Sequence, residues 1–389
     1  MPEDTNLSDC EVHHQLRQAV REICAGFPDA YWRGLDRNRI YPDDFVKSIT
    51  DAGYLAALIP EEYGGAGLGV TEASIILEEV NRSGGNAGAC HAQLYIMGTL
   101  LRHGSEEQKQ RYLPGIASGD LRLQAFGVTE PNTGSDTTQL KTMAVRCDDS
   151  YVVNGQKIWT SRAEYSDLLL LLARTTPLDE VKSRRHGLSV FLVEMNKVDG
   201  LEIRPIRTMI NHATTELFFS DMHIPASSLI GQEGEGFSYI LDGMNAERIL
   251  IGSESIGDAR FFIDRATAYA KEREIFGRPI GQNQGVQFPI ARSYASTEGA
   301  HLMVSKAAAL FDSGISCGPE ANMAKLLAGD AAWAAADMCM QTFGGFGFAE
   351  EYDIERKFRE SRLYQIAPIS TNMILAYIGQ HVLGLPRSY

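Results

Sequence analysis

The segment Gly127-Val128-Thr129-Glu130-Pro131-Asn132-Thr133-Gly134-Ser135-Asp136 decides how this chain is interpreted. Apolar and polar residues alternate ahead of it, from Leu121 to Ala125, which is the two-residue period of a half-buried strand. Pro131 ends that strand, and the small polar residues Asn132–Ser135 offer hydroxyl and backbone N–H groups to an anion. From this segment alone, an ordinary turn between strands is the favoured interpretation.

A second segment follows, Asn154-Gly155-Gln156-Lys157-Ile158-Trp159-Thr160-Ser161. Its Asn-Gly pair predicts a type I′ hairpin turn leading into a strand that carries Trp159. Without the neighbouring motif, a core residue of a β-domain is the preferred explanation of Trp159. Taken together, VTEPNTGSD and NGQKIWTS resemble the two flavin-binding strands of the acyl-CoA dehydrogenases, whose usual forms are close to VTEPGAGSD and NGxKxWIT.

Composition limits the class of protein. The chain has 389 residues, of which 44% are hydrophobic and 22% charged, as expected of an ordinary globular protein with two or three domains. No apolar run approaches the roughly 20 residues of a membrane helix, so we expect no membrane association. A net charge of -14 without a basic stripe argues against nucleic acid as a partner. Met1–Cys10 is polar and acidic, without the features of a secretory signal, and we expect a cytoplasmic protein.

Cysteine and histidine spacing gives no support to a metal site. The six cysteines form no CxxC pair, and the nine histidines never occur as HExxH. A disulfide framework is not predicted either.

The periodicity of the chain predicts three domains. Residues 1–120 are interpreted as helical, and Ser105–Gln108 has the pattern of a capping box. Residues 121–231 are interpreted as an antiparallel β-domain and 232–389 as a four-helix bundle. The fold class is therefore α+β, and the family resemblance implies the same order. The expected strands are 152–153, 168–173, 188–193, 201–206 and 216–224, and the long helical patterns cover about 237–266, 284–312 and 320–343.

The resemblance also implies which residues of the two segments hold the cofactor FAD. Trp159 is implied to pack near the isoalloxazine ring, and Ser161 to lie close to its N5 atom. Residues implied to line the ring and the pyrophosphate are Phe126, Val128, Thr129, Gly134 and Ser135.

Two later segments resemble parts of the family that reach FAD from a neighbouring subunit. Arg273–Gly277 with Gln284 is similar to RxxFGxxI…Q, and Gln341–Gly347 is similar to QxFGGxG. A helix C-terminal cap is the alternative explanation of the latter glycines, and both can hold. The shared cofactor implies a homo-oligomer, and the family is usually a homotetramer, a dimer of dimers. Implied cofactor contacts in the C-terminal third are Arg273, Phe276, Gln284, Gln341, Gly344, Gly345, Ser370 and Asn372.

The catalytic base departs from the commonest form of the family. The usual YQIYEGTSQ segment corresponds to Tyr364–Asn372, where Pro368 replaces the glutamate. Isovaleryl-CoA and long-chain acyl-CoA dehydrogenases instead place a glutamate before a CoA-binding arginine, and the matching pair here is Glu247-Arg248. We therefore take Glu247 as the base and expect its pKa to be raised. Residues expected to bind the substrate are Ser135, Asn245 and Arg248.

Helical spacing gives independent support for this pair. Met244, Glu247, Arg248 and Ile251 stand at i, i+3, i+4 and i+7, so both charges border an apolar stripe. A solvated, inert pair at the rim of a helix is the alternative, since Glu254 and Asp258 fall near the same stripe.

Pro368 also removes a backbone N–H that the family uses to bind the thioester oxygen. Losing one such donor typically costs on the order of 10²- to 10³-fold in rate.

The expected activity is FAD-dependent dehydrogenation of an acyl-CoA to the trans-2-enoyl-CoA, with an electron-transfer flavoprotein as acceptor. A flavin enzyme of the same fold with other chemistry, such as an enoyl-CoA reductase or a flavin monooxygenase, is one alternative. A catalytically weak subunit that binds flavin or CoA is another, and Pro368 makes it worth testing. The sequence leaves the acyl group open.

Overall fold

The computed structural model of this chain describes residues 11–387, so Met1–Cys10, on which the expectation about a secretory signal rests, lies outside the described residues. The chain forms two compact units. Among the described residues, the first comprises residues 11–38, Leu68–Ala87 and residues 248–387, and the second comprises Arg39–Gly67 and Gly88–Glu247. Within residues 11–387, we find no helix both long and apolar enough to cross a membrane.

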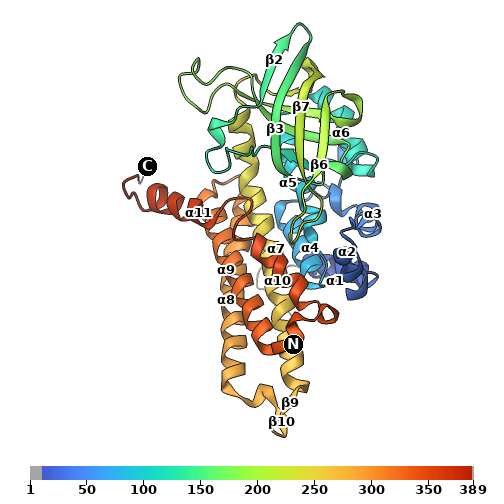
Figure 1. Cartoon of the computed structure of the whole chain (residues 1–389), viewed down its shortest axis with the longest axis vertical. Coiled ribbons are helices and arrows are strands. Elements are labelled where there is room, and N and C mark those ends of the chain that lie inside the picture. Colours follow the sequence, from blue (N-terminus) through green and yellow to red (C-terminus); the bar gives the residue numbers. More distant parts are fainter. Residues whose placement is uncertain (1–10, 388–389) are drawn as a thin grey trace. The chain divides into compact units, whose positions relative to one another are not determined.

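The second unit contains the expected sheet (Figure 1). Its strand order is β6-β7-β3-β2-β4-β5-β8, with β1 paired to β4. Most neighbours are antiparallel, but β1 and β2 pair with β4 in parallel, because the chain returns to β4 through longer connections than a hairpin. The strands are β1 Ala125–Gly127, β2 Met143–Cys147, β3 Ser150–Ser161, β4 Leu168–Arg174, β5 Leu188–Glu194, β6 Leu201–Pro205, β7 Thr214–Pro225 and β8 Leu229–Ile230.

Strand β4 is buried on both faces, as its continuous apolar run predicts. Side chains alternate along a strand, so Leu168, Leu170 and Leu172 enter one core, while Leu169 and Leu171 enter another. The first core is completed by helices α5 (His91–His103) and α6 (Glu106–Ser118), and the second is formed between the strands. This strand therefore joins the two cores of the unit.

The predicted hairpin turn at Asn154-Gly155 is wrong. Both residues lie inside β3, and the two-residue turn between β2 and β3 is formed by Asp148 and Asp149. Gly155 has φ 147°, and a Cβ there would come within 2.6 Å of Thr142 Oγ1. The glycine thus permits a close approach at an irregularity of the strand. The strand expected from Leu121 begins only at Ala125.

Helix starts in the second unit follow the sequence signals. Ser105 accepts a hydrogen bond from the Gln108 backbone N–H (3.1 Å), and the Gln108 side chain accepts one from the Ser105 backbone N–H (3.0 Å). This reciprocal pair is the predicted capping box at the start of α6. Helix α3 (Asp43–Asp51) begins directly after Pro42, with two aspartates in its first turn.

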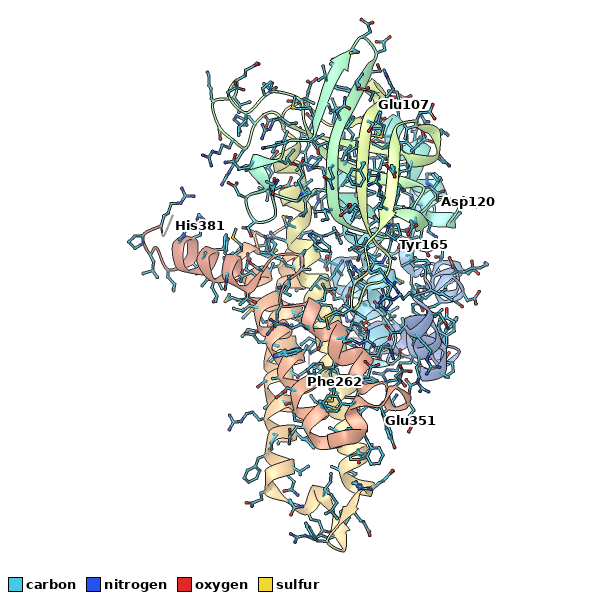
Figure 2. All side chains as sticks on the ribbon, in the orientation of Figure 1. Glu107, Asp120, Tyr165, Phe262, Glu351 and His381 are labelled. Carbon is cyan, nitrogen blue, oxygen red and sulfur yellow. The ribbon has the colours of Figure 1, made fainter. Side chains whose placement is uncertain are left out.

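The first unit is helical. Long helices α8 and α9 pack against each other, and α10 packs on α9; Figure 1 shows them as neighbouring ribbons. Phe262 of α7, labelled in Figure 2, is fully buried in a core with the alanine-rich face of α9. The fourth helix of the expected bundle, α10, is short. The helices are α1 Glu11–Ala25, α2 Asp29–Asn38, α4 Val70–Arg82, α7 Gly236–Glu272 (which begins in the second unit), α8 Gln284–Asp312, α9 Gly318–Phe343, α10 Ile354–Leu363 and α11 Thr371–Tyr377.

A buried charge network joins four helices of the first unit around Glu78, which is 2% exposed. Its carboxylate accepts a hydrogen bond from Arg17 (3.1 Å), pairs with Arg260, and lies 3.4 Å from His301 Nε2. Burial alone would raise the pKa of Glu78, but the positive charges of Arg17 and Arg260 hold it well below its usual range. The carboxylate therefore stays ionised in the interior.

Candidate functional site

The two motif segments, Gly127–Asp136 and Asn154–Ser161, lie side by side in the second unit. Ile158 N donates to Thr129 O (2.9 Å), and the Lys157 ammonium donates to Val128 O (3.0 Å). Lys157 is fully buried and also donates to Glu130 Oε1 (2.9 Å). Segments some thirty residues apart are thus fixed together by a buried ion pair. The sequence alone predicts no role for Lys157 or Glu130, although both lie within these two segments.

The carboxylate of Glu130 organises the turn as well. It accepts hydrogen bonds from the backbone N–H groups of Lys141 (2.7 Å) and Thr142 (2.9 Å). Burial tends to raise the pKa of Glu130, but the Lys157 charge and these donors outweigh it and lower the pKa. Burial lowers the pKa of Lys157 to about 8, against the opposing effect of Glu130. Both groups are therefore charged at neutral pH.

Trp159 is not a core residue of the β-domain. Its side chain is 56% exposed, and its backbone has φ 63°, a left-handed conformation that is unusual for a bulky residue. The cause is a break in the β3–β7 register between Lys157 and Thr160. This bulge turns the indole out of the strand's alternation. Strain of this kind is concentrated at functional sites.

The surroundings of Trp159 contain hydrogen-bonding groups. Ser161 is half-buried, and its hydroxyl accepts a hydrogen bond from the Asn211 side-chain amide (2.8 Å). Phe126, Val128 and Thr129 are half-buried too, so the motif keeps part of its surface open. An exposed indole, a half-buried phenyl ring and half-buried hydroxyls suit a flat aromatic ring with polar edges, so these residue types fit the isoalloxazine expected from the sequence.

The turn after Pro131 is exposed at Gly134 and Ser135. No atom lies within 4 Å of the position that a Cβ of Gly134 would take. The turn is closed by Thr133 N, which donates to Glu130 O (3.0 Å). Gly134 and Ser135 are therefore held on the surface of the second unit, where a ligand can approach their backbone.

The proposed base lies on α7. Glu247, the last residue of the second unit, is 5% exposed and therefore does not match the solvated pair that was the alternative. Asn245 and Arg248 are half-buried. Ile251, Glu254 and Asp258 are also buried, so the predicted stripe extends along α7 with acids inside it.

The segment in which Pro368 replaces the usual glutamate is held in place by a buried lysine. Lys325 of α9, 1% exposed, donates to Ile369 O (2.8 Å), next to Pro368. Ser370 caps α11, since its hydroxyl accepts a hydrogen bond from Met373 N (3.4 Å). Asn372 in the first turn is exposed. Lys325 was not identified from the sequence, because its spacing to Ile369 along the chain carries no signal.

The two segments that resemble the family's contacts with the adenosine half of FAD meet in the first unit. Arg273 follows α7, and its guanidinium lies 5.6 Å from the centre of the Phe346 ring, in the Gln341–Gly347 segment. Phe276 sits in the β9–β10 hairpin (Glu274–Ile275 and Arg278–Pro279) that Figure 1 shows at the end of α7 and α8. It is fully exposed, with φ 56°. The remaining members of this set, Gln284, Gln341, Gly344 and Gly345, are exposed as well.

Comparison with known proteins covers nearly the whole chain. Residues 11–120, 125–222 and 234–383 match the family models described as the N-terminal, middle and C-terminal domains of acyl-CoA dehydrogenase. The acyl-CoA dehydrogenase fadE12 of Mycobacterium bovis is 34% identical, over 99% of this chain and 100% of that protein.

Solved structures are similar as well. A glutaryl-coenzyme A dehydrogenase in complex with glutaryl-CoA has a TM-score of 0.92 at 28% identity, covering 99% of this chain and 98% of that one. The FAD complex of PigA has a TM-score of 0.90 at 25% identity, covering 98% of this chain and 100% of that one.

Proposed function

Since this chain belongs to the acyl-CoA dehydrogenase family, we propose that it converts an acyl-CoA thioester to the trans-2-enoyl-CoA with Glu247 as catalytic base. The observation that carries the proposal is the burial of Glu247 on α7, directly before Arg248. A carboxylate shielded from water can take a proton from the carbon next to the thioester carbonyl. Pro368 has no group that could do so.

The cofactor is FAD, which accepts the hydride from the β-carbon when it is bound. In this proposal Trp159 packs on the ring, Ser161 contacts it at N5, and Gly134 and Ser135 bind the pyrophosphate. Arg248 and Asn245 bind the thioester side of the substrate. Trp159, Gly134 and Ser135 are exposed, and Ser161, Asn245 and Arg248 are half-buried. This supports these roles, because a residue that served only the core would be buried.

A homotetramer with FAD shared between subunits completes the proposal. Arg273, Phe276 and the Gln341–Gly345 segment would reach the adenosine half of a neighbouring subunit's FAD. Supporting this, Phe276, Phe288, Phe346 and Phe348 are 101%, 60%, 42% and 75% exposed, and exposed aromatic side chains are typical of interfaces. An electron-transfer flavoprotein is the proposed acceptor, and one chain similar to this one comes from a structure titled for such a protein of Acidaminococcus fermentans.

An anaerobic titration tests the activity. The purified flavoprotein is mixed with straight, branched and cyclic acyl-CoA thioesters, and the flavin absorbance is followed. Bleaching by one class is expected and would name the acyl group; free CoA, which has no acyl carbon to oxidise, is the control. Turnover with an electron-transfer flavoprotein then tests the acceptor, and sedimentation tests the tetramer.

The second candidate is a catalytically weak subunit that binds flavin and CoA thioesters. It is favoured by Pro368, which cannot donate an N–H to the thioester oxygen. In the same titration this subunit would bind thioesters without bleaching. Dehydrogenation would then be abandoned, while the binding roles of Arg248 and Ser135 would remain testable.

A further inference from the structure

Ser161 is reached by a side chain from outside both motif segments. Asn211 lies in the loop between β6 and β7, and its Nδ2 lies 2.8 Å from Ser161 Oγ. Both residues are half-buried. We propose that Asn211 is a positioning residue that sets the direction of the Ser161 hydroxyl for its contact with FAD. This inference rests on the flavin contact proposed for Ser161.

The loop is built to hold Asn211 in one conformation. Its backbone has φ 55°, in the left-handed region that asparagine tolerates better than most residues. Its carbonyl accepts hydrogen bonds from the hydroxyls of Thr214 (2.6 Å) and Thr208 (3.3 Å). Thr214 is in turn the register partner of Ser161 in the β3–β7 ladder. The amide is thus fixed relative to the strand that carries Ser161.

The orientation of the Asn211 amide follows from Arg162. Arg162 is 6% exposed, and its Nη2 lies 3.4 Å from Asn211 Oδ1. A guanidinium has donors and no acceptors, so the atom facing it must be the amide oxygen. The amide nitrogen therefore faces Ser161 and can only donate to it.

This arrangement fixes what the Ser161 hydroxyl can do. A hydroxyl has one donor and two acceptor sites, and one acceptor site is taken by Asn211. The hydroxyl proton is therefore left to be donated elsewhere. Among residues 11–387, no hydrogen bond takes this proton. A ring nitrogen that lacks hydrogen in the oxidised flavin is an acceptor of the required kind.

Substitutions at Asn211 separate this role from a backbone role. Asn211→Gly keeps the left-handed conformation and removes the amide. Asn211→Asp keeps the size and conformation of the side chain but reverses the direction of the hydrogen bond. A carboxylate only accepts, so the Ser161 hydroxyl would donate its proton to it. Ser161→Ala removes the hydroxyl. Asn154→Gly is the matched control, since Asn154 makes a comparable amide contact with Asp221 (2.9 Å) on the same strand pair.

The readouts are the visible absorption spectrum of the bound flavin and its midpoint potential in the purified holoprotein. Losing one neutral hydrogen bond to the oxidised form changes the ratio of affinities for the two redox forms by about five- to tenfold. A two-electron couple reports this change as a shift of about 20–30 mV. We expect this shift in Ser161→Ala, Asn211→Gly and Asn211→Asp, and none in Asn154→Gly. The double variant Asn211→Gly/Ser161→Ala should match Ser161→Ala alone.

Each other outcome has a defined meaning. If Ser161→Ala leaves spectrum and potential unchanged, the proposed Ser161 contact is wrong and the role of Asn211 falls with it. If Ser161→Ala shifts them while both Asn211 variants behave as wild type, the contact stands and the positioning role is overturned. A loss of FAD in Asn211→Gly that is caused by misfolding leaves Asn211→Asp to decide.

Discussion

Replacing Lys157 by methionine should destabilise the protein by about 3 kcal/mol. Removing one partner of a buried ion pair costs about 3–5 kcal/mol, because the other charge stays buried. Glu130 would keep its hydrogen bonds from Lys141 N and Thr142 N, at 2.7 and 2.9 Å, which places the cost at the lower end. The Val128 carbonyl would also lose its donor. Methionine fills a similar volume, so a cavity adds little.

Urea unfolding followed by circular dichroism measures this free energy. Lys141→Met is the matched control, because Lys141 lies in the same region with an exposed side chain, and its cost should stay within about 0.5 kcal/mol. Adding Glu130→Gln to Lys157→Met should recover about 1–2 kcal/mol, since no charge is then buried. A loss in Lys157→Met no larger than in the control would refute the ion pair as the link between the two motif segments.

Three further predictions concern the base, the substrate and acid stability. Glu247→Gln should keep FAD and lose about 10²- to 10⁴-fold in the rate of flavin bleaching by acyl-CoA; unchanged bleaching would exclude Glu247 as base. Arg248→Ala should weaken thioester binding about 10- to 100-fold in an equilibrium titration, the range for a hydrogen bond made by a charged group, and equal affinity would remove it from the site. Burial lowers the pKa of His301 in the folded protein. As pH drops below about 6.5, the imidazole is therefore protonated in the unfolded chain before it is protonated in the folded protein, and the stability should fall. The pKa of Glu78 is lowered in the folded protein, so its contribution to the free energy of unfolding is present above about pH 4.3 and is lost as pH falls below that value. Glu78→Gln should flatten the acid limb of stability against pH, and an equally steep limb would contradict the role of Glu78.

The sequence was sufficient to predict those structural elements whose signal is local or periodic. The apolar run Leu168–Ala173 became β4, the Ser105 capping box formed as predicted, and the order of helical and β-regions was confirmed. Domain boundaries at 120 and 231 and the roles of the site residues remain predictions. The Asn154-Gly155 turn was wrong because the same dipeptide also suits an irregular strand, and only its neighbour Thr142 decides between the two.

Contacts between residues far apart along the chain could not be predicted from such signals. The pairing of Lys157 with Glu130 depends on which strands become neighbours, and a lysine within a motif looks like a surface residue. Trp159 points outward because a bulge breaks the two-residue alternation of side chains along β3. The sequence alone would use that alternation to place Trp159 on one face of the sheet. The contact between Asn211 and Ser161 joins residues fifty positions apart and has no spacing signature.

The double-sided burial of β4 raises a question of specificity. Because its first five residues are all leucine, sliding the strand by one position would exchange leucine for leucine on both faces and cost little hydrophobic energy. The polar ends break this degeneracy. Asp167 accepts a hydrogen bond from Arg122 N (2.8 Å), and the Arg174 guanidinium donates to Thr138 O (2.7 Å), while Arg174 N donates to Thr142 O (2.8 Å). A slipped strand would leave these groups without their partners, so its alignment is set by Asp167 and Arg174 at the two ends of the apolar run.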